Sequence, residues 1–138
     1  MLSKVILMLI MNILSIDQID HISDLKWNNR LLVIINDGKI DIEKKISRYR
    51  TEFLERDMVI VQVYEKNVFI DHKKMSKRFS MSLFKTIRKA NSEHHLLLIG
   101  KDGKIKNSYP FEIDLNIIFS EVDRMPMRKY EMGKQNRK

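Results

Sequence analysis

Cysteine, whose thiolate serves as a nucleophile and a metal ligand, is absent from this chain. Without cysteine there is no thiolate nucleophile, no disulfide, and no cysteine-ligated zinc or iron–sulfur site. The serines follow no nucleophile-elbow pattern, and no glycine-rich loop of the phosphate-binding type is present. We therefore nominate no catalytic residue, expect no cofactor, and regard an enzymatic role as the less favoured interpretation.

Two adjacent histidines, His94 and His95, come just before an apolar run that begins at Leu96. Neighbouring residues of a strand point to opposite faces, so the pair is poorly placed to hold one metal ion. Together with Asp71 and His72 they follow no recognised ligand spacing. We therefore expect no metal site and a structural role for these histidines.

The basic residues are the remaining lead to function. The chain has 26 lysines and arginines against 18 acidic residues, a formal net charge of +8. The candidate binding residues for an acidic polymer are clustered in sequence: Lys73, Lys74, Lys77, Arg78, Lys85, Arg88 and Lys89. The last three are spaced three and one apart, which places them on one face of a helix. The alternative, an ordinary solvated face that keeps the protein soluble, stays open.

The hydrophobic pattern predicts the elements that carry these residues. Continuous apolar runs at 31–35 and 58–64 are typical of strands covered on both faces, and we expect Trp27 to cover the core beside the first. A helix capped by Asp41 is predicted between them, with an apolar face made of Ile42, Ile46, Tyr49 and Phe53. A strand, a helix and a strand over about 35 residues form a parallel unit.

The second half of the chain predicts a helix, a hairpin and a last helix. After a basic excursion at 68–78, Ser80 caps a helix, and strands at 95–99 and 104–109 form a hairpin. Asp114 caps the last helix, which Pro126 stops. The order β-α-β-α-β-β-α predicts an α/β, thioredoxin-like fold with a four-stranded mixed sheet and helices on both faces.

The first residues of the chain form a separate segment. Lys4 precedes an apolar run at 5–14, and Ser15 ends the run. This order, with a run too short to span a bilayer, is typical of a signal peptide. The expected organisation is a signal peptide at 1–15, a thioredoxin-like domain at 16–126 and a basic tail at 127–138 that frays. The protein would then be periplasmic or secreted; an uncleaved run would instead belong to the fold of a cytoplasmic protein.

Several segments resemble one known family. They are Trp27-Asn28-Asn29-Arg30-Leu31-Leu32, Glu55-Arg56-Asp57, Leu96-Leu97-Leu98-Ile99-Gly100-Lys101-Asp102-Gly103, and Asp123-Arg124-Met125-Pro126-Met127-Arg128 followed by Glu131-Met132. They are similar to the peroxiredoxin-like domain of unknown function that occurs in bacterial exported proteins and in animal matrix proteins of the sushi-repeat and equarin type. The resemblance implies a thioredoxin-like fold and frequent export, with no settled activity.

In the thiol enzymes of that architecture, the reactive cysteine lies where the first strand meets the first helix. The matching residues here form a vestigial corner: Asn36, Asp37, Gly38 and Lys39. None of them can form a thiolate, so peroxidase and disulfide-exchange activities are excluded for this chain. Helical N–H groups at such a corner can attract an anion, but an ordinary turn is the favoured interpretation.

The leading hypothesis is therefore an exported, non-enzymatic binding module with a basic surface. Its partner would be an acidic polymer or an envelope or extracellular protein. Nucleic acid is less favoured because aromatic residues make up only 8% of the chain and do not interleave with the basic cluster. The alternatives are a cytoplasmic basic protein that binds nucleic acid and an enzyme with non-thiol chemistry. We expect no transmembrane span.

Overall fold

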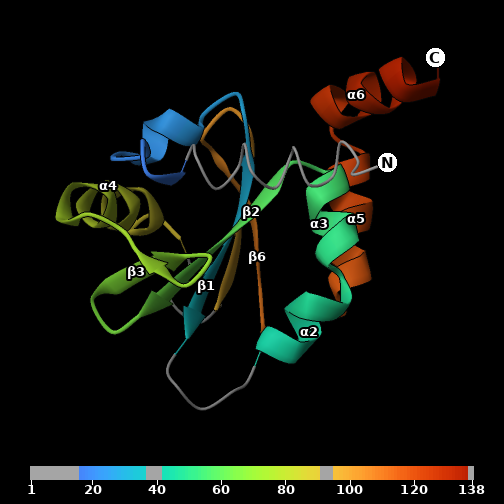
Figure 1. The fold of residues 1–138 in the computed structure, drawn as a ribbon. Helices are drawn as coiled ribbons and strands as arrows, with labels where there is room; N and C mark the ends of the chain where they lie inside the picture. The colour runs from blue at the N-terminus through green and yellow to red at the C-terminus, as the bar shows by residue number, and fades with distance from the viewer. Residues whose placement is uncertain (1–15, 37–41, 91–94, 137–138) are drawn as a thin grey trace, which may run out of the picture.

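The computed structural model describes residues 16–36, 42–90 and 95–136 (Figure 1). In chain order the elements are η1 (Ile22–Leu25), β1 (Arg30–Asn36), α2 (Glu43–Arg48), α3 (Arg50–Glu55), β2 (Met58–Tyr64), β3 (Asn67–Ile70), β4 (Lys73–Lys74), α4 (Lys77–Ile87), β5 (Leu96–Ile99), β6 (Ile105–Tyr109), α5 (Leu115–Asp123) and α6 (Pro126–Asn136). The strands within these ranges form one mixed sheet in the order β4-β3-β2-β1-β5-β6. The predicted α/β class is confirmed.

Strand β1 lies in the middle of the sheet. It pairs in parallel with β2, where Arg30 lies opposite Met58, and antiparallel with β5. Alternate residues of β1 enter two separate hydrophobic clusters, with Leu32 in one and Leu31 in the other. Because both faces of the strand are covered, its sequence is continuously apolar rather than alternating.

Helices cover both faces of the sheet (Figure 1). On one face α2, α3 and α5 pack together, and the rings of Phe53 and Phe119 meet edge to face with centroids 5.0 Å apart. On the other face α4 buries Phe79 and Leu83. Short helix η1 is fastened to α4 because the amide of Ile22 donates to the Oγ of Ser82 at 3.0 Å. The two faces therefore have separate cores, one under each helical layer.

The expected count of four strands is wrong, because the structure adds a hairpin. Strands β3 and β4 form it at 67–74, which overlaps the stretch at 68–78 that the sequence pattern left as a basic excursion. Val68 and Ile70 are buried on one side of β3, while Phe69 between them is half-buried. Strand β4 consists of two exposed lysines at the edge of the sheet, too short for a hydrophobic period to reveal it.

Two helix boundaries also differ from prediction. Ser76, rather than Ser80, caps α4, because its Oγ accepts from the Phe79 amide at 3.1 Å. Ser80 lies inside the helix and donates to the Ser76 carbonyl. Pro126 follows the end of α5 and also begins α6, since proline suits a first helical turn that needs no amide donor. The expected fraying of the tail is therefore wrong for residues 126–136.

The predicted closing elements are confirmed. Strands β5 and β6 pair antiparallel around the turn Gly100–Gly103. Gly103 adopts φ +79°, a left-handed conformation that glycine takes without a Cβ clash. Asp114 caps α5, and its carboxylate accepts from the Asn116 amide at 2.9 Å. The second half of the chain thus adds the edge strand β6 to the sheet and places α5 on one of its faces.

Replacing Ser76 by alanine removes the acceptor that satisfies the Phe79 amide. We expect Ser76→Ala to lower the free energy of unfolding by about 1 kcal/mol, measured by urea denaturation followed by circular dichroism. Ser80→Ala is the matched control: alanine favours the helix interior and no cap is lost, so its change should stay within about 0.5 kcal/mol. A larger loss for Ser80→Ala than for Ser76→Ala would contradict the cap assignment.

Candidate functional site: a basic surface and a buried ionic network

The seven basic residues predicted as a binding site are all exposed, and they lie on β4, on α4 and in the turn after α4. Only two residues separate Lys73 and Lys74 from α4. An α-helix turns about 100° per residue, so Lys77, Arg78 and Lys85 fall within about 100° of one another around α4. We call the set the basic surface: Lys73, Lys74, Lys77, Arg78, Lys85, Arg88 and Lys89. The structure thus places Lys77, Arg78 and Lys85 on one side of α4, with Lys73 and Lys74 two residues before the helix and Arg88 and Lys89 directly after it.

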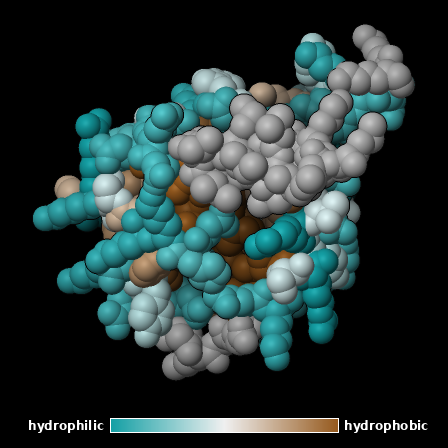
Figure 2. Space-filling view, in the orientation of Figure 1, coloured by the Kyte–Doolittle hydropathy of each residue, from teal (hydrophilic) through white to brown (hydrophobic). Residues whose placement is uncertain are grey.

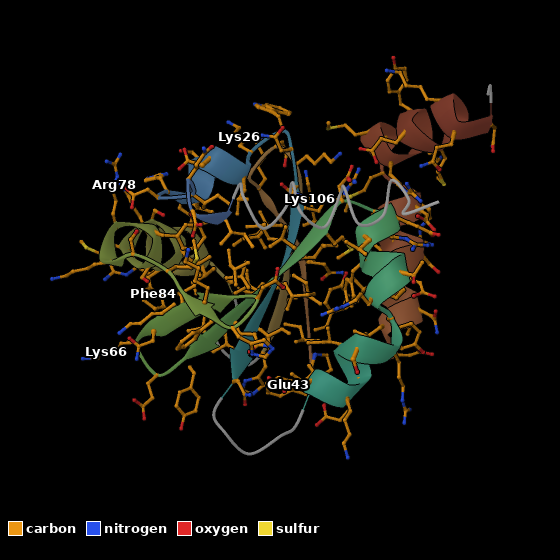
Figure 3. All side chains as sticks on the ribbon, in the orientation of Figure 1. Lys26, Glu43, Lys66, Arg78, Phe84 and Lys106 are labelled. Atoms are coloured by element: carbon orange, nitrogen blue, oxygen red, sulfur yellow. The ribbon has the colours of Figure 1, made fainter. Side chains whose placement is uncertain are left out.

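The amphipathic character of α4 determines which side chains reach solvent. Phe79 and Leu83 are fully buried against the sheet, so the cations occupy the outer side of the helix. Arg78 projects away from the sheet in Figure 3, and hydrophilic side chains dominate the same side of the molecule in Figure 2. Residues 77–89 contain no aspartate or glutamate. The positive charge of α4 is therefore not neutralised within its own helix.

A short acidic segment neutralises one end of the basic surface. Asp17 pairs with Lys73, and an oxygen of Asp20 lies 3.8 Å from the Nε of Arg78. Asp20 also accepts a hydrogen bond from Ser76 at 2.6 Å. The remaining cations have no carboxylate within 4.0 Å among the described residues: Lys74, Lys77, Lys85, Arg88 and Lys89. Most of the basic surface is therefore available to an external anion.

A second charged cluster lies where β1 and β2 begin and β5 ends. We call it the ionic network, and its members are Arg30, Arg56, Asp57, Lys101, Asp123, Arg128 and Glu131. Three of its cations are almost fully buried: Arg30 is 1%, Arg128 4% and Lys101 8% exposed. Buried charges are tolerated only when they are paired and hydrogen-bonded. The geometry of their partners therefore decides whether this cluster is stable.

Glu131 of α6 is the centre of one half of the network. Its carboxylate accepts from Arg30 Nη1 at 3.1 Å and Nη2 at 3.2 Å, and from Lys101 Nζ at 2.6 Å. Lys101 also donates to Asp57 at 2.8 Å. Burial alone would raise the pKa of Glu131. The hydrogen bonds and positive charges of Arg30 and Lys101 lower it by more than burial raises it, so the pKa of Glu131 lies below its ordinary value of 4.5. Glu131 is therefore ionised at neutral pH.

Asp123 of α5 is the centre of the other half. It accepts from Arg56 at 2.9 and 3.0 Å and from Arg128 at 3.1 Å. Main-chain carbonyls take further guanidinium donors, with Arg30 bonded to the Arg56 carbonyl and Arg128 to the Glu55 carbonyl, each at 2.9 Å. In the part of the chain that the structure describes, no buried side-chain polar atom lacks a partner. The network is saturated, which suits it to fastening α5 and α6 rather than to catalysis.

Sequence reasoning did not single out the ionic network as a site. All seven of its residues nevertheless lie within the segments that carry the family resemblance. The local signal is a charged residue beside a continuous apolar run, as with Arg30 before Leu31 and Lys101 after Ile99–Gly100. Such a residue sits next to the core and needs a buried partner. Which residue becomes that partner depends on the tertiary fold, and the sequence pattern does not predict such long-range contacts.

The structure describes one residue of the vestigial corner. Asn36 is the last residue of β1, while Asp37, Gly38 and Lys39 lie outside the described residues. Asp41, the expected cap of the first helix, lies outside them as well. The ordinary turn favoured for this corner therefore stays a prediction, and an anion site stays its alternative.

The aromatic side chains of His95 and Trp27 lie in different environments. The ring of His95 stacks on Phe111 with centroids 4.6 Å apart, a packing contact, whereas His94 lies outside the described residues. Trp27 is 60% exposed, so its expected role as a cover of the core is wrong. Its backbone has a left-handed φ of +70°, and its amide donates to the Lys101 carbonyl at 2.6 Å.

Neither a metal centre nor a membrane span is found in the described ranges. No group of three or more histidine, aspartate or glutamate side chains there is placed to hold a metal ion. None of the helices in those ranges has the length and apolar character needed to cross a bilayer.

Neutralising Glu131 removes the carboxylate charge that Arg30 and Lys101 share, and both cations stay buried. We expect Glu131→Gln to lower the free energy of unfolding at pH 7 by about 3 kcal/mol, measured by urea denaturation. Because the folded-state pKa of Glu131 is depressed, its stabilisation is present above the ordinary value of 4.5 and disappears as the pH falls through the folded value. The difference in free energy of unfolding between wild type and Glu131→Gln should therefore disappear at low pH.

Glu112→Gln is the control for that variant, since Glu112 is an exposed glutamate whose side chain pairs with no basic group among the described residues. It should change the free energy of unfolding by less than about 0.5 kcal/mol at either pH. Equal stability of Glu131→Gln and wild type at pH 7 would refute a fastening role for the network.

One family model matches this chain, over residues 21–131, and it is described as a domain of unknown function (DUF4174). These bounds include every residue of the ionic network and of the basic surface. No curated protein and no solved structure was found to match. The match covers well over half of the 138 residues, and the chain therefore belongs to the DUF4174 family of domains of unknown function.

Proposed function

We propose that this protein is an exported, non-enzymatic module of thioredoxin-like architecture that binds an acidic polymer through its basic surface. The observation that carries the proposal is the outer side of α4, where exposed cations gather without a carboxylate in the helix itself. Clustered positive charge of this kind attracts polyanions by releasing their counterions. The parallel pair β1–β2 and the helices on both faces support the thioredoxin-like assignment.

The absence of cysteine and the saturation of the ionic network support binding over catalysis. A cavity of about 150 Å³ beside η1 is lined chiefly by apolar and small residues, among them Leu25, Leu31 and Gly103. Its one carboxylate, Asp102, is paired with Lys106 at 2.7 Å. Burial raises the pKa of Asp102, but the hydrogen bonds from Lys106 and the Lys104 amide outweigh it and hold that pKa below its ordinary value. Among the described residues no second acidic group lines the cavity beside Asp102, so the convergent titratable groups that favour an enzyme are lacking there.

The composition of the basic surface favours an acidic polymer other than nucleic acid. Proteins that bind single strands usually stack bases on exposed aromatic rings. The aromatic residues of α4 point inward, with Phe79 fully buried and Phe84 partly buried. The surface would then recognise charge density rather than bases. Binding to nucleic acid remains the alternative that the experiment below distinguishes.

The first test removes charge from the basic surface. We expect wild type to bind heparin with an affinity that falls steeply with salt. The triple variant Lys85→Gln, Arg88→Gln and Lys89→Gln should bind more weakly, and the slope of log Kd against log salt should fall by up to about three units. Fluorescence anisotropy of labelled heparin at several salt concentrations gives both quantities.

The matched control is Lys44→Gln, Arg48→Gln and Arg50→Gln, which removes three exposed cations from α2 and α3 on the opposite face of the sheet. It should keep the wild-type affinity and salt slope. Equal weakening by both triple variants would show that net charge alone governs binding, against a defined surface. Stronger binding to single-stranded DNA than to heparin would favour the nucleic-acid alternative.

Export is tested by the amino terminus of the native protein. We expect intact-mass measurement on separated cell fractions to find a chain that begins near Ile16 outside the cytoplasm, because residues 1–15 have the order of a signal peptide. A chain that keeps Met1 and stays in the cytoplasm would refute export and make nucleic acid the favoured partner.

A further inference from the structure

Met81 lies in the middle of the charged side of α4. Its side chain is 62% exposed, the most exposed large apolar side chain of that helix. At about 100° per residue, Met81 falls between Lys77 and Arg88 on one side and Arg78 and Lys85 on the other. An apolar, flexible side chain is therefore surrounded by cations on an outer helix.

We infer that the basic surface also binds the anionic headgroup layer of a membrane, besides an acidic polymer, an inference that rests on the proposed binding function of that surface. A polyanion in solution would engage only the charges. A bilayer surface offers phosphates to the cations and an apolar layer just beneath them. Met81 enters that layer while the cations stay at the level of the headgroups.

The neighbouring side chains suit this geometry. Lysine and arginine have long apolar stems that lie along an apolar surface while the charged head reaches water or phosphate. Lys77 and Lys85 are each four residues from Met81, about one turn of the helix, and Arg88 follows about two turns after Met81 on the same side, so their stems extend the apolar strip that Met81 begins. The α4 helix lies on the outside of the sheet, where a flat surface can approach it (Figure 1).

The acidic segment restricts where the membrane would contact the protein. Asp17 and Asp20 pair with Lys73 and Arg78, at the end of the basic surface nearest β4. An anionic headgroup layer would be repelled there and attracted by the later turns of α4. The contact would therefore be centred on Met81 and Lys85.

The experiment measures co-sedimentation of the full chain with vesicles of phosphatidylcholine, with and without phosphatidylglycerol. We expect binding only to the anionic vesicles. Met81→Gln keeps the charge and should weaken that binding about fivefold, because the apolar contribution is lost. The same variant should bind heparin like wild type. The Lys85, Arg88 and Lys89 triple variant should lose roughly a hundredfold, at about fivefold per cation.

Each outcome separates this inference from the proposed function. Binding to heparin without binding to anionic vesicles would overturn the membrane inference alone. Unchanged vesicle binding by Met81→Gln, or by the triple variant, would also overturn it. Failure to bind either probe would overturn the proposed function as well.

The absence of cysteine permits a direct probe of insertion. Met81→Cys carries an environment-sensitive fluorophore as the one thiol of the chain, and its emission should shift to the blue on anionic vesicles. Met127→Cys is the control, because Met127 is an exposed methionine on α6, away from the basic surface. A blue shift of equal size at Met127, or none at Met81, would refute insertion at α4.

Discussion

Arg30 and Glu131 are separated by 101 positions in the sequence and joined by a bidentate pair at 3.1 and 3.2 Å. Arg30 begins the central strand at the edge of the core, so its guanidinium cannot reach bulk water. An unpaired cation there would carry a desolvation penalty of several kcal/mol, which is a large part of the stability of a small domain. The position of α6, and with it the closure of the molecule, depends on satisfying that one buried charge.

The molecule uses charge in two physically different ways. In the ionic network every buried group has a partner, and the low dielectric around it strengthens each bond while penalising any that is lost. On the basic surface the cations are solvated and mostly without carboxylate partners among the described residues, so their mutual repulsion is screened by water and salt. The first arrangement holds the chain together, and the second leaves it able to attract an anion.

Particular elements show how far sequence reasoning reached. The unbroken apolar run at β1 predicted a strand covered on both faces, and the turn at Gly100–Gly103 predicted the β5–β6 hairpin, because both signals are local. Strand β4 escaped detection because two lysines at a sheet edge carry no periodicity. The tail that forms α6 was expected to fray because its sequence is mostly polar and basic. The helix is held against the domain because Arg128 and Glu131 bond to groups far away in the sequence.

The sequence by itself determined the α/β class, the absence of thiol chemistry and the clustering of seven cations between positions 73 and 89. These follow from composition and short-range spacing, which folding does not alter. The tertiary structure decided that Arg30, Lys101 and Glu131 meet, and that Trp27 faces solvent rather than the core. It also decided that Met81 stands among the cations of α4 in solvent, since which side of a helix is buried depends on the surface against which it packs.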